Sequence, residues 1–251
     1  MDAVDRRYAH GEAVMAFSLL PYAGPGAPPR TFVAVHGIGM GRIVFTGVAE
    51  HLAPHGRVLA VDLPGFGDSP EPGSAAPLEE TAEFVAGFIL SEAQGPVVLI
   101  GHSMGTQIVS EVALHHPELV EALVLIAPTV NRYERTVAKQ AMRMMQDLSG
   151  EGAKVLLLGL WEYTKTSPAW YVRKLRFMLE HHLERICPSI ASPTLVLRGE
   201  TDRVCPRDWV SEVAGSIPDA VMREIPGRGH EAIIKSPEPV ASMILDFVGA
   251  R

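Results

Sequence analysis

The stretch 97-VVLIGHSMGTQIVSEVALHH-116 joins a short apolar run to an amphipathic run through a G-x-S-x-G turn. The first run predicts a buried strand and the second a helix. A serine between them stands on a sharp turn that exposes its hydroxyl, and Gly101 and Gly105 avoid collisions where strand and helix crowd together. Ser103 is therefore the candidate nucleophile, and the backbone N–H of Met104 is a candidate donor to a developing oxyanion.

Outside this stretch, apolar runs alternate with helix-like segments. The almost continuous apolar runs are typical of strands that are covered on both faces, as in parallel sheets. We expect an α/β fold with a mostly parallel central sheet flanked by helices, and one or two edge strands before residue 30, including the run at 13–20. Strands are expected at 31–35, 57–62, 96–101, 120–127, 193–199 and 220–225, and helices at 43–53, 77–94, 104–116, 206–217 and 237–249.

Residues 128–192 interrupt this alternation, because they contain no convincing strand. They predict a helical lid inserted after strand 6, with helices near 132–148, 151–165 and 168–186. Such an insertion would cover the carboxyl edge of the sheet, where open α/β sheets bind ligands. We therefore divide the chain into a core of residues 1–127 and 193–251 and a lid of residues 128–192. Apolar lid side chains are candidate substrate contacts, although packing explains most of them: Met142, Met145, Leu157, Trp161 and Trp170.

A serine nucleophile needs a base, and the base needs a carboxylate that orients it. Among ten histidines, His230 lies in the glycine-rich loop 226-PGRGHEA-232, after the last expected strand. Asp202 follows the strand at 193–199 and is the candidate acid. Glu200 is its competitor, and we expect it to form a structural hydrogen bond instead.

The glycine-rich loop 36-HGIGMG-41 follows the strand at 31–35. Glycines at the carboxyl end of a strand let the backbone approach a substrate closely. The N–H of Ile38 is the expected second oxyanion donor. We expect His36 to support this loop through hydrogen bonds rather than to take part in catalysis.

Together with 62-DLPGFGDS-69, these motifs resemble the α/β-hydrolase superfamily over nearly the whole chain. A serine at the nucleophile turn implies its serine branch, which includes esterases, lactonases, thioesterases and C–C bond hydrolases. The resemblance implies no metal and no organic cofactor. The chain departs from many relatives in one place, because Ile43, Val44 and Phe45 stand where those relatives carry a tryptophan after the oxyanion loop.

Composition restricts the possible partners. The formal net charge is −7 and no Lys/Arg run occurs, so nucleic acid is an unexpected partner. No apolar stretch is long enough for a bilayer and no signal peptide is recognisable, so we expect a cytoplasmic protein, as a monomer or homodimer. Cys187 and Cys205 are expected to be free thiols. His181 and His182 are interpreted as part of a solvated charged run rather than as metal ligands.

The favoured hypothesis is a serine hydrolase that cleaves a small-to-medium apolar ester, lactone or thioester through an acyl-enzyme. One alternative is a C–C bond hydrolase of a diketone acid. Another is a thioesterase or acyltransferase for acyl chains linked to a carrier protein. The lid cations would then bind the acidic carrier protein, although a solvated helix face also explains them. A non-catalytic ligand receptor on the same scaffold is a further alternative. The lid cations are Arg132, Arg135, Lys139 and Arg143.

Overall fold

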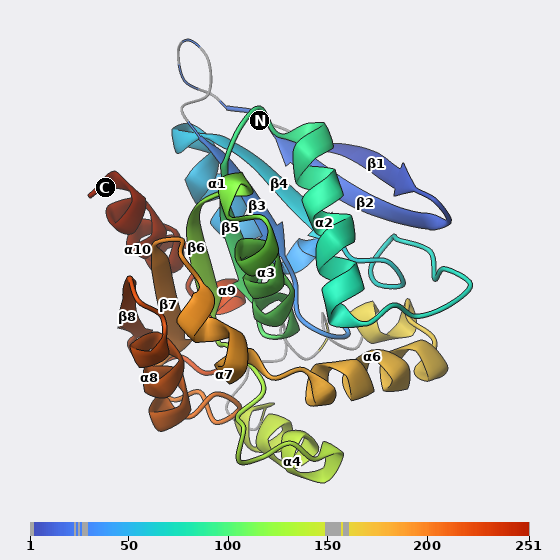
Figure 1. Ribbon diagram of the computed structural model, residues 1–251, viewed down its shortest axis with the longest axis vertical. Helices are drawn as coiled ribbons and strands as arrows, with labels where there is room; N and C mark the ends of the chain where they lie inside the picture. Colours follow the sequence, from blue (N-terminus) through green and yellow to red (C-terminus); the bar gives the residue numbers. More distant parts are fainter. Residues whose placement is uncertain are drawn as a thin grey trace.

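The computed structural model describes residues 3–22, 24, 26, 30–148, 157 and 161–250. An eight-stranded sheet runs through the molecule in the order β1-β2-β4-β3-β5-β6-β7-β8 (Figure 1). β1 and β2 pair antiparallel with their neighbours, and the strands from β4 to β8 pair in parallel. The predicted α/β fold is confirmed. The strands are β1 (Val4–His10), β2 (Ala13–Leu20), β3 (Thr31–Val35), β4 (Arg57–Asp62), β5 (Val97–His102), β6 (Val120–Ile126), β7 (Thr194–Gly199) and β8 (Ala220–Ile225).

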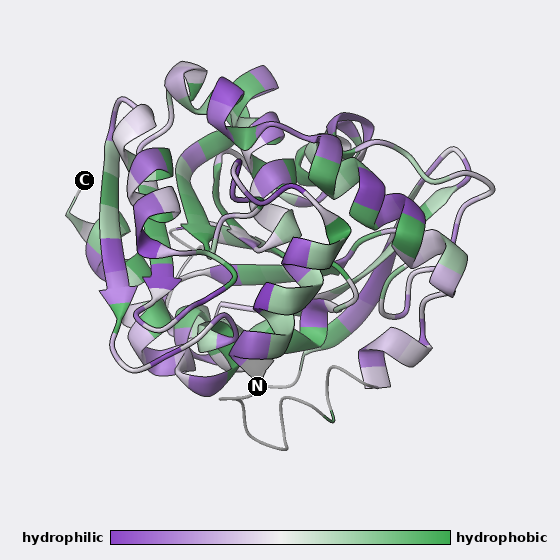
Figure 2. Ribbon diagram, turned by 90° about the horizontal axis from the view of Figure 1, so that it is seen from below, coloured by the Kyte–Doolittle hydropathy of each residue, from purple (hydrophilic) through white to green (hydrophobic). Residues whose placement is uncertain are grey.

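Helices cover both faces of the sheet. In β3, Val33 and Val35 belong to the apolar cluster under α2, α3 and α8, whereas Phe32 and Ala34 belong to the cluster under α1, α9 and α10. Side chains alternate between faces along a strand, so burial of both faces requires the continuous apolar run seen in the sequence. The central strands are accordingly mostly green in Figure 2. These helices are α1 (Thr46–Leu52), α2 (Leu78–Glu92), α3 (Met104–His115), α8 (Arg207–Ser216), α9 (Ala232–Lys235) and α10 (Pro237–Gly249), with 3-10 turns η1 (Arg42–Phe45), η2 (Ala53–His55) and η3 (Pro117–Leu119).

The described residues between β6 and β7 form helices and no strand. They include α4 (Val137–Leu148), α6 (Pro168–Glu180), α7 (Leu183–Ile186) and the 3-10 turn η4 (Cys187–Ser189), and α4 and α6 lie at the lower edge of Figure 1. The helix expected at 151–165 falls mostly outside the described residues, although residues 161–164 are helical. None of the described helices has both the length and the apolar character needed to span a bilayer.

The predicted helix 168–186 is interrupted at His181 and His182. His181 is only 5% exposed, and its Nε2 lies 2.6 Å from Oε1 of Glu111 on α3. The prediction that this histidine pair is solvated is therefore wrong for His181. A buried imidazole needs a polar partner, and Glu111 supplies one where the helical segment bends toward the core.

The start of α6 is attached to the loop that follows β4. Thr166 Oγ1 donates to the carbonyl of Gly65 at 3.0 Å, and the Ser167 N–H donates to Glu71 at 2.7 Å. Trp170 is almost fully buried against Gly65. Lys174 Nζ donates to the carbonyl of Ala76 at 2.8 Å. These contacts fix α6 over the carboxyl end of the sheet.

Candidate active site

The turn between β5 and α3 holds Ser103 in a backbone conformation that L-residues rarely adopt, with φ 53° and ψ −121°. The turn is possible because its flanking residues lack side chains. A Cβ on Gly101 would lie 2.6 Å from the Gly105 carbonyl oxygen, and a Cβ on Gly105 would lie 2.3 Å from the Val35 carbonyl oxygen. The glycine requirement predicted from the G-x-S-x-G pattern therefore has a direct steric cause.

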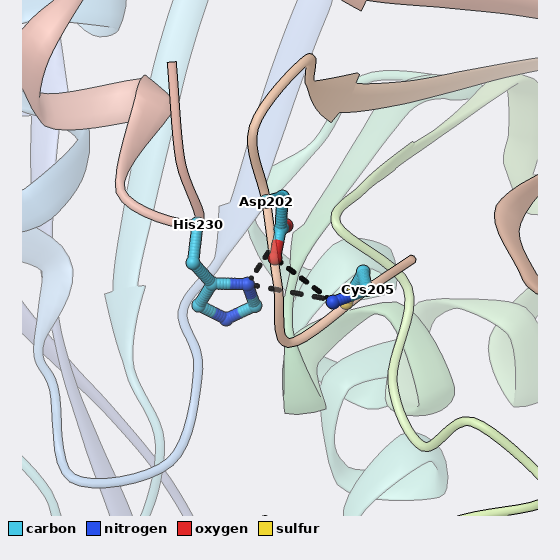
Figure 3. Close-up of side chains that lie close together, drawn as sticks. All are labelled: Asp202, Cys205 and His230. Carbon is cyan, nitrogen blue, oxygen red and sulfur yellow. Dashed lines mark hydrogen bonds and ion pairs between the residues drawn. The ribbon is translucent and has the colours of Figure 1, made fainter. Parts of the chain in front are cut away.

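The structure brings Ser103, His230 and Asp202 together, although they are far apart in sequence. His230 Nε2 lies 3.1 Å from Ser103 Oγ, and His230 Nδ1 lies 3.0 Å from Asp202 Oδ2. Figure 3 shows the imidazole edge facing the carboxylate. All three residues are buried. With Nδ1–H donated to the carboxylate, Nε2 is free to accept the serine proton.

Burial and the carboxylate act in opposite directions on His230. Burial lowers the pKa of His230, but the charge of Asp202 and its hydrogen bond raise it, and the resulting pKa lies well above the ordinary 6.5. The carboxylate thus favours the imidazolium that would form when Ser103 loses its proton. Burial and the nearby His230 lower the pKa of His102 to about 3, so His102 is neutral at physiological pH.

The acid is held by its own loop. Asp202 Oδ1 accepts the N–H groups of Val204 and Cys205, each at 2.8 Å, which leaves Oδ2 for the base. Glu200 accepts the N–H of Gly227 at 2.8 Å in an exposed position. The prediction that Glu200 forms a structural hydrogen bond is confirmed.

Cys205 adds a thiol beside the base. Its Sγ lies 3.9 Å from His230 Nδ1, and Asp202, Cys205 and His230 each offer a ligand atom within 4.8 Å of the others (Figure 3). Burial, followed by the Asp202 charge, raises the pKa of Cys205 to about 12. With this pKa the thiol is protonated at neutral pH and packs as a neutral group against the acid and base.

The loop after β3 lies directly against the nucleophile. A Cβ on Gly37 would approach Ser103 Cβ to 2.9 Å. His36 Nδ1 donates to the Gly37 carbonyl at 2.7 Å, and its Nε2 accepts the Leu63 N–H at 2.9 Å, so the predicted supporting role of His36 is confirmed. Within the described part of the chain, the N–H groups of Ile38 and Met104 donate no hydrogen bond. Both remain available for a ligand oxygen.

A cavity of about 340 Å³ opens beside Ser103. Side chains from the helical segment form most of its wall, and the pocket is mainly apolar. The lining residues are Ile38, Ser103, Thr129, Val137, Gln140, Ala141, Met144, Met145, Tyr163, Tyr171, Leu175, Met178 and Val204.

Of the five predicted substrate contacts, Met145 lines this cavity. Met142, Leu157 and Trp161 are exposed and do not line it, and Trp170 on α6 is buried against Gly65. Sequence reasoning missed Tyr163 and Tyr171, whose hydroxyl oxygens lie 3.0 Å apart.

Comparison with known proteins identifies the family. The model of the alpha/beta hydrolase family matches residues 32–243, which is most of the chain. The chain belongs to the alpha/beta hydrolase family. The predictions of a hydrolase and of its fold are thereby confirmed. This is the family that the chain was predicted to resemble from 36-HGIG-39, 101-GHSMG-105 and the later motifs.

This hydrolase has relatives with different substrates. It is 26% identical to a pimeloyl-[acyl-carrier protein] methyl ester esterase of Vibrio vulnificus, with 86% of this chain and 93% of that protein covered. It is 28% identical to a 2-hydroxy-6-oxo-6-(2'-aminophenyl)hexa-2,4-dienoic acid hydrolase of Metapseudomonas resinovorans, with 91% and 86% covered. A thermophilic esterase from Thermogutta terrifontis shares the fold with a TM-score of 0.82 at 23% identity, covering 100% and 99% of the two chains.

Three of the four cations predicted to form a patch between β6 and β7 are paired with glutamates of the same chain. Arg132 Nε lies 3.0 Å from Glu212, Arg135 Nη2 lies 2.6 Å from Glu184, and Arg143 Nη2 lies 2.6 Å from Glu134. Each partner carboxylate neutralises its cation, so the patch presents much less positive charge than its sequence indicates.

Two further residues that hold the site were missed. Arg198 on β7 is buried and donates to the Asp202 carbonyl at 3.1 Å and to the Cys205 carbonyl at 3.2 Å. His102 Nε2 donates to the carbonyl of His230 at 3.1 Å. Neither role could be predicted from the neighbouring sequence. Arg198 lies within an apolar strand, and the partner of His102 is 128 residues away in the chain.

Proposed function

We propose that this protein is a serine hydrolase that cleaves a small-to-medium, neutral and largely apolar carboxylic ester, lactone or thioester through an acyl-enzyme. The observation that carries the proposal is the hydrogen-bonded chain from Ser103 Oγ through His230 to Asp202, placed at the wall of an apolar cavity. We propose further that residues 128–192 act as the lid that supplies the substrate-binding wall.

The proposed reaction follows from the directions of these hydrogen bonds. Ser103 Oγ attacks the acyl carbon while His230 Nε2 takes its proton, and Asp202 stabilises the imidazolium. The N–H groups of Ile38 and Met104 bind the oxyanion. His230 then returns the proton to the leaving alcohol or thiol, which departs. Water attacks the acyl-enzyme with His230 again as base, releasing the acid and free Ser103.

The lining of the cavity supports a neutral acyl group. Its described lining residues carry no Lys, Arg, Asp or Glu side chain. A substrate carboxylate buried there would lose its hydration without gaining a cation, which is costly. This argues against the diketone-acid alternative, whose substrate carries such a charge. Methionine side chains adapt to varied apolar shapes, which suits esters of several chain lengths.

The carrier-linked alternative has support from the names of relatives such as the Vibrio vulnificus esterase. An acidic carrier protein would need unpaired cations near the pocket. Arg132, Arg135 and Arg143 are instead paired with glutamates of this chain, so among the described residues Lys139 alone of the four predicted cations is exposed without an ion pair. We therefore favour a free small molecule as the substrate over a carrier-bound acyl chain.

Labelling with a fluorophosphonate tests the mechanism and the receptor alternative together. Wild-type protein should label and hydrolyse p-nitrophenyl esters, and Ser103→Ala should do neither while its melting temperature stays nearly unchanged. Ser110→Ala is the matched control, because Ser110 is a buried α3 serine whose Oγ has no hydrogen-bond partner among the described residues. Hydrolysis by Ser103→Ala at the wild-type rate would exclude the mechanism.

The substrate class needs a separate comparison. The p-nitrophenyl ester of hexanoic acid should be cleaved with a kcat/KM at least about tenfold above that of the mono-p-nitrophenyl ester of adipic acid, because the second carries a terminal carboxylate that must be desolvated. Equal rates would show that the pocket accepts an anion, and the neutral-substrate proposal would fail even with the triad intact.

A further inference from the structure

A buried carboxylate near the end of α4 contacts both loops that carry the proposed acid and base. Asp147 is 6% exposed. Its Oδ2 accepts the backbone N–H of His230 at 2.9 Å, and its Oδ1 accepts the backbone N–H of Arg203 at 3.0 Å. Arg203 directly follows Asp202. One side chain from the helical segment therefore binds the backbone at the base and beside the acid.

Neither N–H has a partner in regular secondary structure, since both lie in loops beyond the ends of β7 and β8. A buried backbone donor without an acceptor is costly, so these loops would have to move if the acceptor were lost. A carboxylate has two oxygens and satisfies both donors at once. Asp147 is thus suited to fix the separation of the two loops.

The two loops also bind each other, through the Thr201 N–H to the Arg228 carbonyl at 2.8 Å and the Gly227 N–H to Glu200 at 2.8 Å, and further contacts come from the sheet side of the molecule. Arg198 on β7 binds the carbonyl of Asp202, and His102 at the end of β5 binds the carbonyl of His230. Asp147 binds the same two loops from α4. The same helix lines the cavity beside Ser103 through Gln140, Met144 and other residues.

We propose that Asp147 is a positioning residue for the hydrolytic reaction, which holds the backbone of His230 in register with Asp202 and so couples α4 to the alignment of the base with Ser103. The inference rests on the proposed serine-hydrolase function. The base nitrogen must lie about 2.6–3.2 Å from the oxygen whose proton it takes, and the observed 3.1 Å between His230 Nε2 and Ser103 Oγ leaves little tolerance. A change in the position of α4 alters the substrate wall and the base together.

The test compares Asp147→Asn and Asp147→Ala with the wild type. Asparagine keeps the shape but has one acceptor oxygen, so its NH₂ group must face one of the two N–H donors. Alanine removes both acceptors. Glu134→Gln is the matched control, because Glu134 is also a buried carboxylate in the helical segment but pairs with Arg143 and contacts neither loop.

We expect Asp147→Ala to lower kcat and the rate of fluorophosphonate labelling about 10- to 100-fold, since small misplacements of a catalytic group have effects of this size. KM for a p-nitrophenyl ester should change little, because the apolar wall remains. Asp147→Asn should retain part of the rate, and Glu134→Gln should stay within about twofold of wild type. Melting temperatures establish that each variant is folded.

Three results would overturn the inference: a folded Asp147→Asn with the wild-type kcat, a loss confined to KM, or an equal loss of kcat in Glu134→Gln. The last would mean that any disturbed carboxylate of the helical segment has the same effect. Because Asp147→Asn is isosteric, it keeps the test decisive if the alanine variant does not fold. Failure of the proposed function looks different, since wild-type protein would then neither label nor hydrolyse esters.

Discussion

Replacing Asp202 with Asn separates the tautomer of His230 from the geometry of the site. Oδ1 accepts two backbone N–H groups, from Val204 and Cys205, and an amide oxygen can keep both bonds. The amide NH₂ must then occupy the Oδ2 position, 3.0 Å from His230 Nδ1. Two donors cannot face each other, so the imidazole moves its proton to Nε2. A protonated Nε2 cannot accept the proton of Ser103.

The magnitude follows from the role of a triad carboxylate. Loss of the correct tautomer lowers kcat by about 10⁴-fold in Ser-His-Asp sites, or about 5.4 kcal/mol of transition-state stabilisation. The pH dependence moves as well. Burial lowers the pKa of His230, and the Asp202 charge is the largest of the interactions that raise it. Without that charge the lowering by burial is less opposed, so the base titrates at lower pH, and the residual activity should reach its plateau at lower pH than in wild type.

The assay is p-nitrophenyl ester hydrolysis between about pH 5 and 9, the range in which histidine titrates. Glu200→Gln in the same loop is the control, because Glu200 is exposed and its side chain binds only the Gly227 N–H among the described residues. It should stay within about twofold of wild type. A loss below about tenfold for Asp202→Asn, or a shift of its profile to higher pH, would refute the reasoning.

Two further substitutions test the framework of the site. Gly105→Ala places a Cβ 2.3 Å from the Val35 carbonyl oxygen and should cost about 3 kcal/mol or more, lowering the melting temperature by roughly 6–12 °C; an unchanged melting curve would contradict the steric argument. Glu111→Gln weakens the buried contact with His181 and should lower the unfolding free energy by about 1–3 kcal/mol in a urea titration, with labelling of Ser103 retained; equal stability would show that the contact contributes nothing.

The sheet could be predicted because each central strand carries its own signal. A strand covered on both faces needs a nearly unbroken apolar run, and β3 and β4 begin and end where the expected runs do. The bounds of β1 could not be predicted from the sequence in the same way. Its sequence VDRRYAH is mostly exposed at the sheet edge, so it is stabilised by backbone pairing with β2 and leaves no apolar pattern.

The candidate triad was predictable for a related reason. Ser103 has a turn with steric requirements, and Asp202 and His230 follow strand ends in the chain order of this fold. The residues that line the cavity could not be predicted from the sequence. Which face of each helix points inward depends on how the helices between β6 and β7 pack against the core. On α4, Met144 and Met145 line the cavity and Met142 does not, although Met145 is 72% exposed. An apolar composition alone does not distinguish these positions.

Long-range polar contacts were also beyond the sequence. Asp147 binds His230 across 83 positions, and His181 binds Glu111 across 70. Each reads locally as a charged or polar residue on a helix, for which solvent is the ordinary partner. Only the tertiary arrangement shows that these side chains are buried and satisfy polar groups of other elements.

The two halves of the site differ in what holds them. Ser103 is held by backbone geometry, since it lies in a tight turn between β5 and α3 that has no room for a Cβ at Gly101 or Gly105. Asp202 and His230 lie instead on loops whose order depends on side chains, one of which, Asp147, comes from the helix that also contacts the substrate cavity. Changes in that helix can therefore alter substrate preference only within limits set by the base, whereas the nucleophile is independent of them.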